Sequence, residues 1–218
     1  MQREPEIENR SLINIAHLVD CTEAEGPGRR FAIWFQGCPL RCPGCCNPEM
    51  LSFEGGESLP RREVVQRMQT VAREQNIEGI TLLGGEPFAH AASGAMLARE
   101  ARSLDLSVMI FSGFVLEDVQ DNPDPNTQEL LGLTDLLVDG PYLRDQPDRA
   151  RRWIGSANQR IHFLTNRYRE DDPCWRSPNT LEIRLTGPEL TVNGFPADSA
   201  VGLWKRSPAD KHRKGKAI

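Results

Sequence analysis

Short apolar runs and amphipathic stretches alternate along most of the chain. Five runs have the length and the flanking residues of buried strands, at 30–36 (RFAIWFQ), 79–84 (GITLLG), 106–113 (LSVMIFSG), 135–141 (DLLVDGP) and 159–165 (QRIHFLT). Between them, four stretches place apolar residues at helical spacing, over 58–76, 96–104, 115–120 and 127–133. Strands that alternate with helices predict βαβ units around a parallel sheet, and five strands are too few for a closed eight-stranded barrel. We therefore predict an α/β fold with an open or partial barrel.

The clearest helix pattern and the end of the chain follow different periods. In 58–76, Ser58 offers an N-cap, Pro60 is tolerated in the first turn, and one face is apolar, with Val64, Val65, Met68, Val71 and Ala72. Residues 181–196 (LEIRLTGPELTVNGFP) instead alternate with a period of two on both sides of Gly187 and Pro188. This second pattern predicts a C-terminal β-hairpin.

Unusual residues follow four successive predicted strands. A cysteine-rich loop follows 30–36, and GGEP, SGF and DGPY follow the next three strands. In parallel α/β folds the binding sites gather on loops at the carboxyl ends of the strands. The four loops therefore predict one shared site.

Composition and charge add the class of protein. The chain has 218 residues, of which 39% are hydrophobic and 26% charged, and it has no apolar run of transmembrane length. Its charged beginning lacks the apolar core of a signal peptide, so we expect a cytoplasmic protein. We expect one domain over 1–204 and a basic tail over 205–218, where six Lys or Arg face one Asp. Such a tail is typical of a solvated terminus, and we do not expect nucleic-acid binding from it.

Three cysteines at C-x3-C-x2-C spacing, Cys38, Cys42 and Cys45, predict a metal centre. Thiols in a reducing compartment serve metal or redox chemistry more often than disulfides. Three thiolates on one tight loop suit a cubane iron–sulfur cluster that keeps one iron open. Spacing alone leaves a zinc site possible, with Cys46, Cys21 or Cys174 as the fourth ligand.

The cysteine loop and GGEP together resemble the two motifs of the radical S-adenosylmethionine (SAM) enzymes. The segments at 25–49 (EGPGRRFAIWFQGCPLRCPGCCNPE), 136–142 (LLVDGPY) and 155–161 (GSANQRI) are most similar to the activases of glycyl-radical enzymes, in particular of anaerobic ribonucleotide reductase. This resemblance implies a partial (β/α)6 radical SAM barrel and one 4Fe–4S cluster. It also implies SAM cleavage to a 5′-deoxyadenosyl radical, a glycyl-radical enzyme as protein partner, and an electron donor such as flavodoxin or ferredoxin.

The resemblance also implies roles for individual residues. Cys38, Cys42 and Cys45 are the expected cluster ligands, and Gly84, Gly85 and Glu86, with Pro87 closing the motif, are expected at the SAM amino group. Further SAM contacts are expected from Gly44 and Cys46 near adenine, from Ser112 and Gly113 at the ribose or methionine part, and from Asp139 and Arg160 at later strand ends.

Several alternatives stay open at this point. Asp139 equally suits a turn-capping carboxylate. Cys46 stands where the ribonucleotide-reductase activases often have an aromatic residue, and we expect its thiol to pack, because free cysteine is commonly buried. Two other functions compete with the activase: a radical SAM enzyme that modifies a peptide or small molecule, and a non-enzymatic zinc or cluster-binding adaptor.

Overall fold

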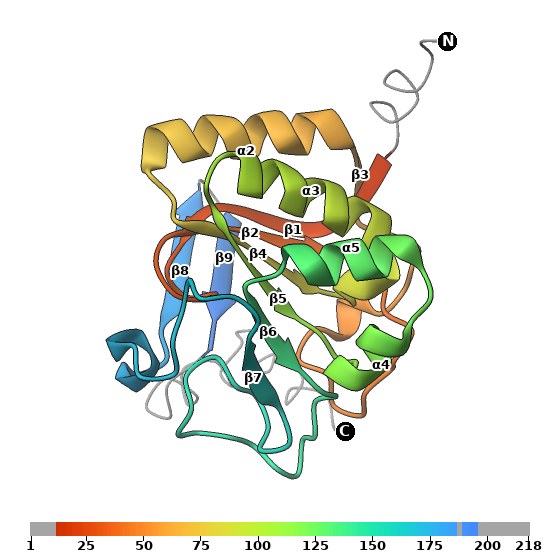
Figure 1. Ribbon diagram of the computed structural model, residues 1–218, viewed down its shortest axis with the longest axis vertical. Coiled ribbons are helices and arrows are strands. Elements are labelled where there is room, and N and C mark those ends of the chain that lie inside the picture. Colours follow the sequence, from red (N-terminus) through yellow and green to blue (C-terminus); the bar gives the residue numbers. More distant parts are fainter. Residues whose placement is uncertain (1–11, 187–188, 196–218) are drawn as a thin grey trace, which may run out of the picture.

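The computed structural model describes residues 12–186 and 189–195, and it has a seven-stranded mixed sheet with a separate hairpin (Figure 1). The sheet order is β3-β1-β2-β4-β5-β6-β7. The strands are β1 (Leu12–Thr22), β2 (Arg30–Phe35), β3 (Glu57–Pro60), β4 (Gly79–Gly84), β5 (Ser107–Phe111), β6 (Leu136–Asp139) and β7 (Arg160–Phe163). The helices are α2 (Arg61–Gln75), α3 (Ala91–Ser103), α4 (Leu116–Asp121) and α5 (Pro125–Leu133). Three 3-10 turns cover Pro48–Met50, Pro87–His90 and Pro173–Arg176.

The centre of the sheet is the predicted α/β arrangement. Strands β2, β4, β5 and β6 run parallel, and α2, α3 and the α4–α5 pair connect them in turn. All five predicted strands are present, but β7 pairs with β6 antiparallel, so the prediction of a further parallel strand there is wrong. The physical reason is that no helix separates β6 from β7, and a loop over 140–159 returns the chain instead. Strands β1 and β3 add two antiparallel pairs at the other edge.

Three further sequence predictions concern the start of α2 and the end of the chain. The helix expected from Ser58 begins at Arg61, because Ser58 lies in β3, and Pro60 precedes the helix without a side-chain cap. The predicted hairpin is present as β8 (Leu181–Thr186) and β9 (Glu189–Gly194), paired antiparallel. The basic tail over 205–218 lies outside the described residues, and its prediction is untested.

The sheet has an apolar layer on each of its two faces. Helices α2, α3 and α5 cover one face (Figure 1), where Phe31, Ile33 and Phe35 of β2 enter the larger core. The alternate residues Ala32 and Trp34 point to the opposite face, as the strand period of two requires. On that face, Met109 of β5 packs with Trp153. No helix among the described residues is long and apolar enough to cross a membrane.

Candidate cofactor site

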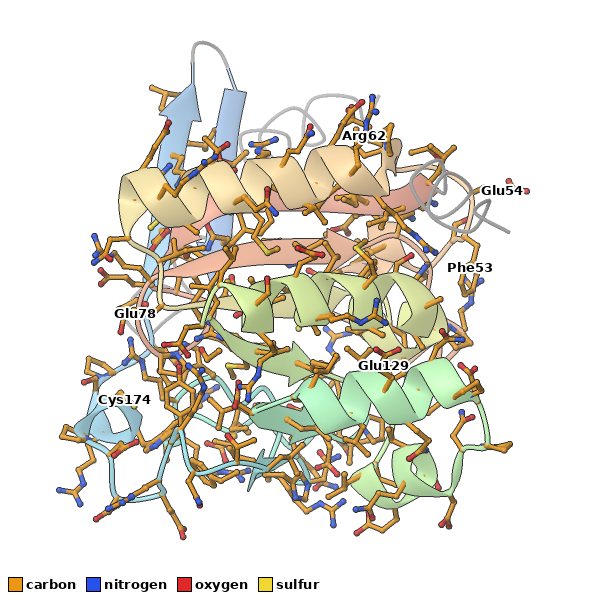
Figure 2. All side chains as sticks on the ribbon, turned by 45° about the horizontal axis from the view of Figure 1, so that its top comes forward. Phe53, Glu54, Arg62, Glu78, Glu129 and Cys174 are labelled. Carbon is orange, nitrogen blue, oxygen red and sulfur yellow. The ribbon has the colours of Figure 1, made fainter. Side chains whose placement is uncertain are left out.

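A cavity of about 180 Å³ lies at the carboxyl ends of β2, β4 and β5. All four loops that the sequence singles out line it: the cysteine loop, the segment from Gly84 to Glu86, Ser112 with Gly113, and Gly140 with Tyr142 after β6. Figure 2 shows the two ends of the sheet: Phe53, which follows the cysteine loop, and Glu78, which precedes β4, lie at opposite sides of the molecule. The loops converge because parallel neighbours place their carboxyl ends at the same edge.

The cysteine loop is held by backbone hydrogen bonds to the segment that follows it. The backbone N–H of Gly37 donates to Met50 O (3.0 Å), and that of Cys38 donates to Leu51 O (3.2 Å). The three predicted ligands Cys38, Cys42 and Cys45 all line the cavity. The loop therefore presents its thiols to one common space.

Burial and backbone N–H groups act in opposite directions on the thiols of the cysteine loop. Burial raises the pKa of the Cys38 thiol, while hydrogen bonds from the backbone N–H groups of Leu40 and Arg41 act in the opposite direction. Burial likewise raises the pKa of Cys45, opposed by the N–H of Asn47. Backbone N–H groups directed at sulfur are a recurrent feature of iron–sulfur sites. Among the described residues, no three His, Cys, Asp or Glu side chains are grouped as the ligands of a single metal ion, whereas each cysteine of a 4Fe–4S site binds its own iron.

Gly84 and Gly85 press the second loop directly against the cysteine loop. Gly84 has a φ of +99°, a conformation that favours glycine. The N–H of Gly85 donates to Phe35 O (2.8 Å), and the N–H of Glu86 donates to Gly37 O (3.0 Å). A Cβ on Gly85 would lie 2.2 Å from the Gly37 oxygen, so only glycine permits this approach.

The carboxylate of Glu86 ties the second loop to the third. Its side chain is fully buried and accepts hydrogen bonds from the N–H of Phe88 (3.0 Å), the hydroxyl of Ser112 (2.9 Å) and the N–H of Gly113 (2.8 Å). None of these three donors carries a charge, and burial raises the pKa of Glu86 to about 7. A carboxylate at the cavity wall without a cationic partner is suited to receive a cation.

Most of the predicted site residues line this cavity, but Gly44, Pro87, Asp139 and Arg160 do not. Gly44 lies on a neighbouring cavity of about 540 Å³, which it lines with Pro43 and residues 142–145. Pro87 is buried at the start of the 3-10 turn that follows Glu86. Asp139 accepts a hydrogen bond from the N–H of Leu116 (2.7 Å) at the start of α4 and pairs with Arg160 (2.5 Å), so its carboxylate is engaged within the fold.

Cys46 differs from its expected environment. Its side chain is exposed, so the expectation that it packs in the interior is wrong. It lines the cavity and hydrogen-bonds with the Tyr142 side chain, because the loop after β6 returns to this point. Neither Cys21 nor Cys174 lines the cavity.

Four aromatic residues of the cavity wall have no role assigned from the sequence. They are Phe111, Tyr142, Trp153 and Phe195. Tyr142 closes the segment that carries the family resemblance, which was a usable signal. Trp153 and Phe195 follow a basic loop and a hairpin, respectively, and no local pattern marks either residue as part of a site.

The comparisons with known proteins agree with the donor set. The family model for the 4Fe-4S single cluster domain matches residues 24–162. The anaerobic ribonucleoside-triphosphate reductase-activating protein of Vibrio cholerae is 32% identical over 146 residues, which are 64% of this chain and 91% of that protein. The protein of the same name from Enterobacteria phage T4 is 27% identical over 158 residues, 71% of this chain and 96% of that protein.

A solved structure is also similar in part. The crystal structure of QueE from Escherichia coli matches 52% of this chain and 58% of that chain, with 17% identity and a TM-score of 0.38.

Proposed function

The chain belongs to the 4Fe-4S single cluster domain family and to the family of anaerobic ribonucleoside-triphosphate reductase-activating proteins, and on this premise we propose that it is a radical SAM activase. Its task would be to install a glycyl radical on a partner enzyme. The observation that carries the proposal is one cavity at the carboxyl ends of β2, β4 and β5, where three thiols meet the loop of Gly84, Gly85 and Glu86.

The cysteine loop would hold one cluster. Cys38, Cys42 and Cys45 have the right donor type, line a common space and receive backbone N–H groups at two of the three sulfurs. When bound, a 4Fe–4S cluster with three thiolate ligands supplies an open iron for SAM and the electron for its reductive cleavage. The proposed electron donor is a flavodoxin or ferredoxin.

The second and third loops would bind SAM. Within the described part of the chain, the hydrogen-bond donors of Glu86 are all neutral, so the SAM ammonium group would provide its missing counter-charge. Gly84 and Gly85 leave the backbone at the cavity wall free of side chains, and Ser112 and Gly113 complete the wall. Cys46 and Tyr142 lie at the edge that faces the larger cavity, where Gly44 lies. We place adenine at this edge, and we propose Asp139 as a support for the loop after β6.

The partner would approach through the open side of the sheet. We propose that the parallel strands β2, β4, β5 and β6 form the core of a partial (β/α)6 barrel, with the cavity inside its carboxyl end. The neighbouring cavity of about 540 Å³ gives room beside the cofactor for a segment of another protein. A macromolecular substrate requires such an accessible site.

The decisive experiment is anaerobic reconstitution with iron and sulfide, followed by a SAM-cleavage assay. We expect about four iron atoms per chain and 5′-deoxyadenosine from the wild-type protein. Cys42→Ala is expected to lose both, whereas the matched control Cys174→Ala, whose sulfur does not line the cavity, keeps both. In Figure 2, Cys174 lies on the side of Glu78, away from Phe53.

The activase step has its own readout. With the co-produced glycyl-radical enzyme, we expect a doublet in the electron paramagnetic resonance spectrum of the partner. SAM cleavage without any partner radical would favour a peptide or small-molecule substrate instead. A colourless protein that holds zinc would refute every radical SAM function of the chain.

A further inference from the structure

The C-terminal hairpin is an addition to the region that the family model matches. Strands β8 and β9 begin at Leu181, whereas the match ends at residue 162. They form a two-stranded sheet of their own, apart from the seven-stranded sheet (Figure 1). The position of this hairpin therefore has to be explained by its own contacts.

The hairpin docks on the body of the protein through its polar face. Its contacts to the turn after β1 are Glu182 Oε1 with Glu23 N (2.7 Å), Arg184 Nη2 with Cys21 O (2.6 Å), and Asn193 Nδ2 with Thr22 Oγ1 (2.9 Å) and Glu25 Oε1 (3.3 Å). Asn193 is only 6% exposed, while Ile183, Leu185 and Leu190 of the other face are each more than 60% exposed. Directional hydrogen bonds, rather than apolar burial, hold the hairpin in place.

The chain leaves β9 at the cofactor cavity. Phe195 directly follows Gly194, the last residue of β9, and it lines the cavity. Its ring centroid lies 5.7 Å from that of Phe111, the last residue of β5, which also lines the cavity. The hairpin thus extends the cavity wall beyond the seven-stranded sheet.

The same turn also fixes a second aromatic residue of the wall. The indole N–H of Trp153 donates to Ala24 O (3.1 Å), next to the residues that bind Asn193. Trp153 is buried and has a φ of +60°, a conformation that its surroundings must enforce. The turn over 22–25 therefore positions both Trp153 and the hairpin that carries Phe195.

We propose that the hairpin is a cofactor-site element of this chain, in which Phe195 packs against bound SAM and Asn193 is the positioning residue that holds Phe195 there. The inference rests on the proposed function, because it names SAM as the ligand. An aromatic ring offers apolar area to a nucleoside and an electron-rich face to a sulfonium cation, and both are parts of SAM. It also keeps water away from the cavity.

The test is the dissociation constant of SAM, measured by equilibrium binding to the full-length, anaerobically reconstituted protein. Phe195→Ala is expected to weaken SAM binding about tenfold, the size of one lost aromatic contact. Phe195→Leu, which keeps apolar volume, is expected to lose less. Ile183→Ser on the exposed face of the same hairpin is the matched control and is expected to leave the constant unchanged.

A double-mutant cycle separates positioning from a general structural effect. Asn193→Ala is expected to weaken SAM binding through Phe195, so the double variant with Phe195→Ala should bind no more weakly than the weaker single variant. Fully additive losses would overturn the positioning role. Iron content is measured for each variant. If Phe195→Ala does not take up iron, Phe195→Leu replaces it in the cycle.

The failure of this inference is distinct from the failure of the proposed function. If Phe195→Ala and Phe195→Leu both bind SAM within twofold of the wild-type constant with full iron content, Phe195 is not part of the SAM site. If the iron-loaded wild-type protein binds no SAM, the proposed function itself is wrong, and this inference falls with it.

Discussion

Asp135 and Glu86 are buried carboxylates at opposite ends of the parallel strands, and they have different hydrogen-bond partners. Asp135, at the amino end of β6, accepts hydrogen bonds from Arg102 (2.7 and 2.9 Å), the N–H of Val108 (2.8 Å) and Thr165 (2.6 Å). Glu86, at the carboxyl end of β4, accepts three hydrogen bonds, all from neutral donors. Both side chains are fully buried. The protein therefore supplies a counter-charge for Asp135 at the amino ends of the strands, whereas a ligand has to supply one for Glu86 at the carboxyl ends.

Arg30 is a buried cation at the amino ends of the strands: burial lowers its pKa, and the charges of Tyr168, Asp135 and Glu78 act against this shift. It is fully buried at the amino end of β2 and donates to Thr81 Oγ1 (2.6 Å), Pro27 O (2.9 Å) and Ile80 O (2.5 Å). Its hydrogen-bonding groups are thus occupied by the protein itself. A polar network that is complete within the chain stabilises the fold, and an incomplete one marks a place for a ligand.

The largest expected effect on stability comes from removing the Asp135 carboxylate at the amino ends of the strands. Asp135→Ala leaves Arg102 and the N–H of Val108 without their partner, and we expect the free energy of unfolding to fall by about 3 kcal/mol. Chemical denaturation measures this loss. SAM affinity of the folded fraction is expected to stay the same. A loss of SAM affinity at unchanged stability would contradict the separation of roles between Asp135, which stabilises the fold, and Glu86, which faces the ligand.

A third buried carboxylate, Glu25, offers a pH test. Its side chain is 3% exposed, and burial raises its pKa from 4.5 to about 7. Asn193 and the N–H of Gly194 oppose this shift by hydrogen bonding, and the charges of Glu182 and Arg184 act in opposite directions. The folded state therefore binds a proton more tightly than the unfolded state does.

The sign of the pH effect follows from that preference. The stabilising contribution is complete below about pH 4.5 and is lost as the pH rises through about 7, to a total of about 3 kcal/mol. Glu25→Gln keeps a neutral hydrogen-bonding group and should remove this part of the pH dependence. The measurement is the difference in unfolding free energy between wild type and variant from pH 5 to 8. Parallel curves would show that Glu25 does not titrate in this range.

A smaller effect on stability is expected where the cysteine loop and the loop of Gly84 to Glu86 touch. Gly85→Ala places a Cβ 2.2 Å from the Gly37 oxygen, and we expect a loss of about 2 kcal/mol and weaker retention of iron. Gly132→Ala is the matched control, since nothing lies within 4 Å of the added Cβ and alanine favours the helix. Equal behaviour of the two variants would refute the role of the close approach.

The smallest effect is expected at an exposed ion pair. Arg67 and Asp20 lie 2.6 Å apart, with side chains 51% and 36% exposed. Arg67→Ala is expected to change the unfolding free energy by about 0.5 kcal/mol or less, because solvent screens such pairs. The comparison with Asp135→Ala measures how much burial adds to an ion pair in this protein.

The sequence predicted the local features of the fold well. The five strand patterns, the helices and the hairpin around Gly187 and Pro188 depend on residues close together in the chain. Strand β1 was not predicted, because its apolar residues are interrupted by Asn14, His17 and Asp20. The direction of β7 was wrong, because a pattern of apolar residues carries no information about which way a strand runs.

The same division between local sequence pattern and tertiary contact applies to the site. The spacing of Cys38, Cys42 and Cys45 predicted a metal centre, and the resemblance carried by this loop and the GGEP motif narrowed it to a cluster, because both motifs are short-range features. Only the tertiary structure brought Phe195 beside Phe111, left Glu86 with neutral donors and exposed Cys46 beside Tyr142. These contacts join segments that are distant in the chain, and their geometry depends on how the strands pair and where the hairpin docks, which no local pattern encodes.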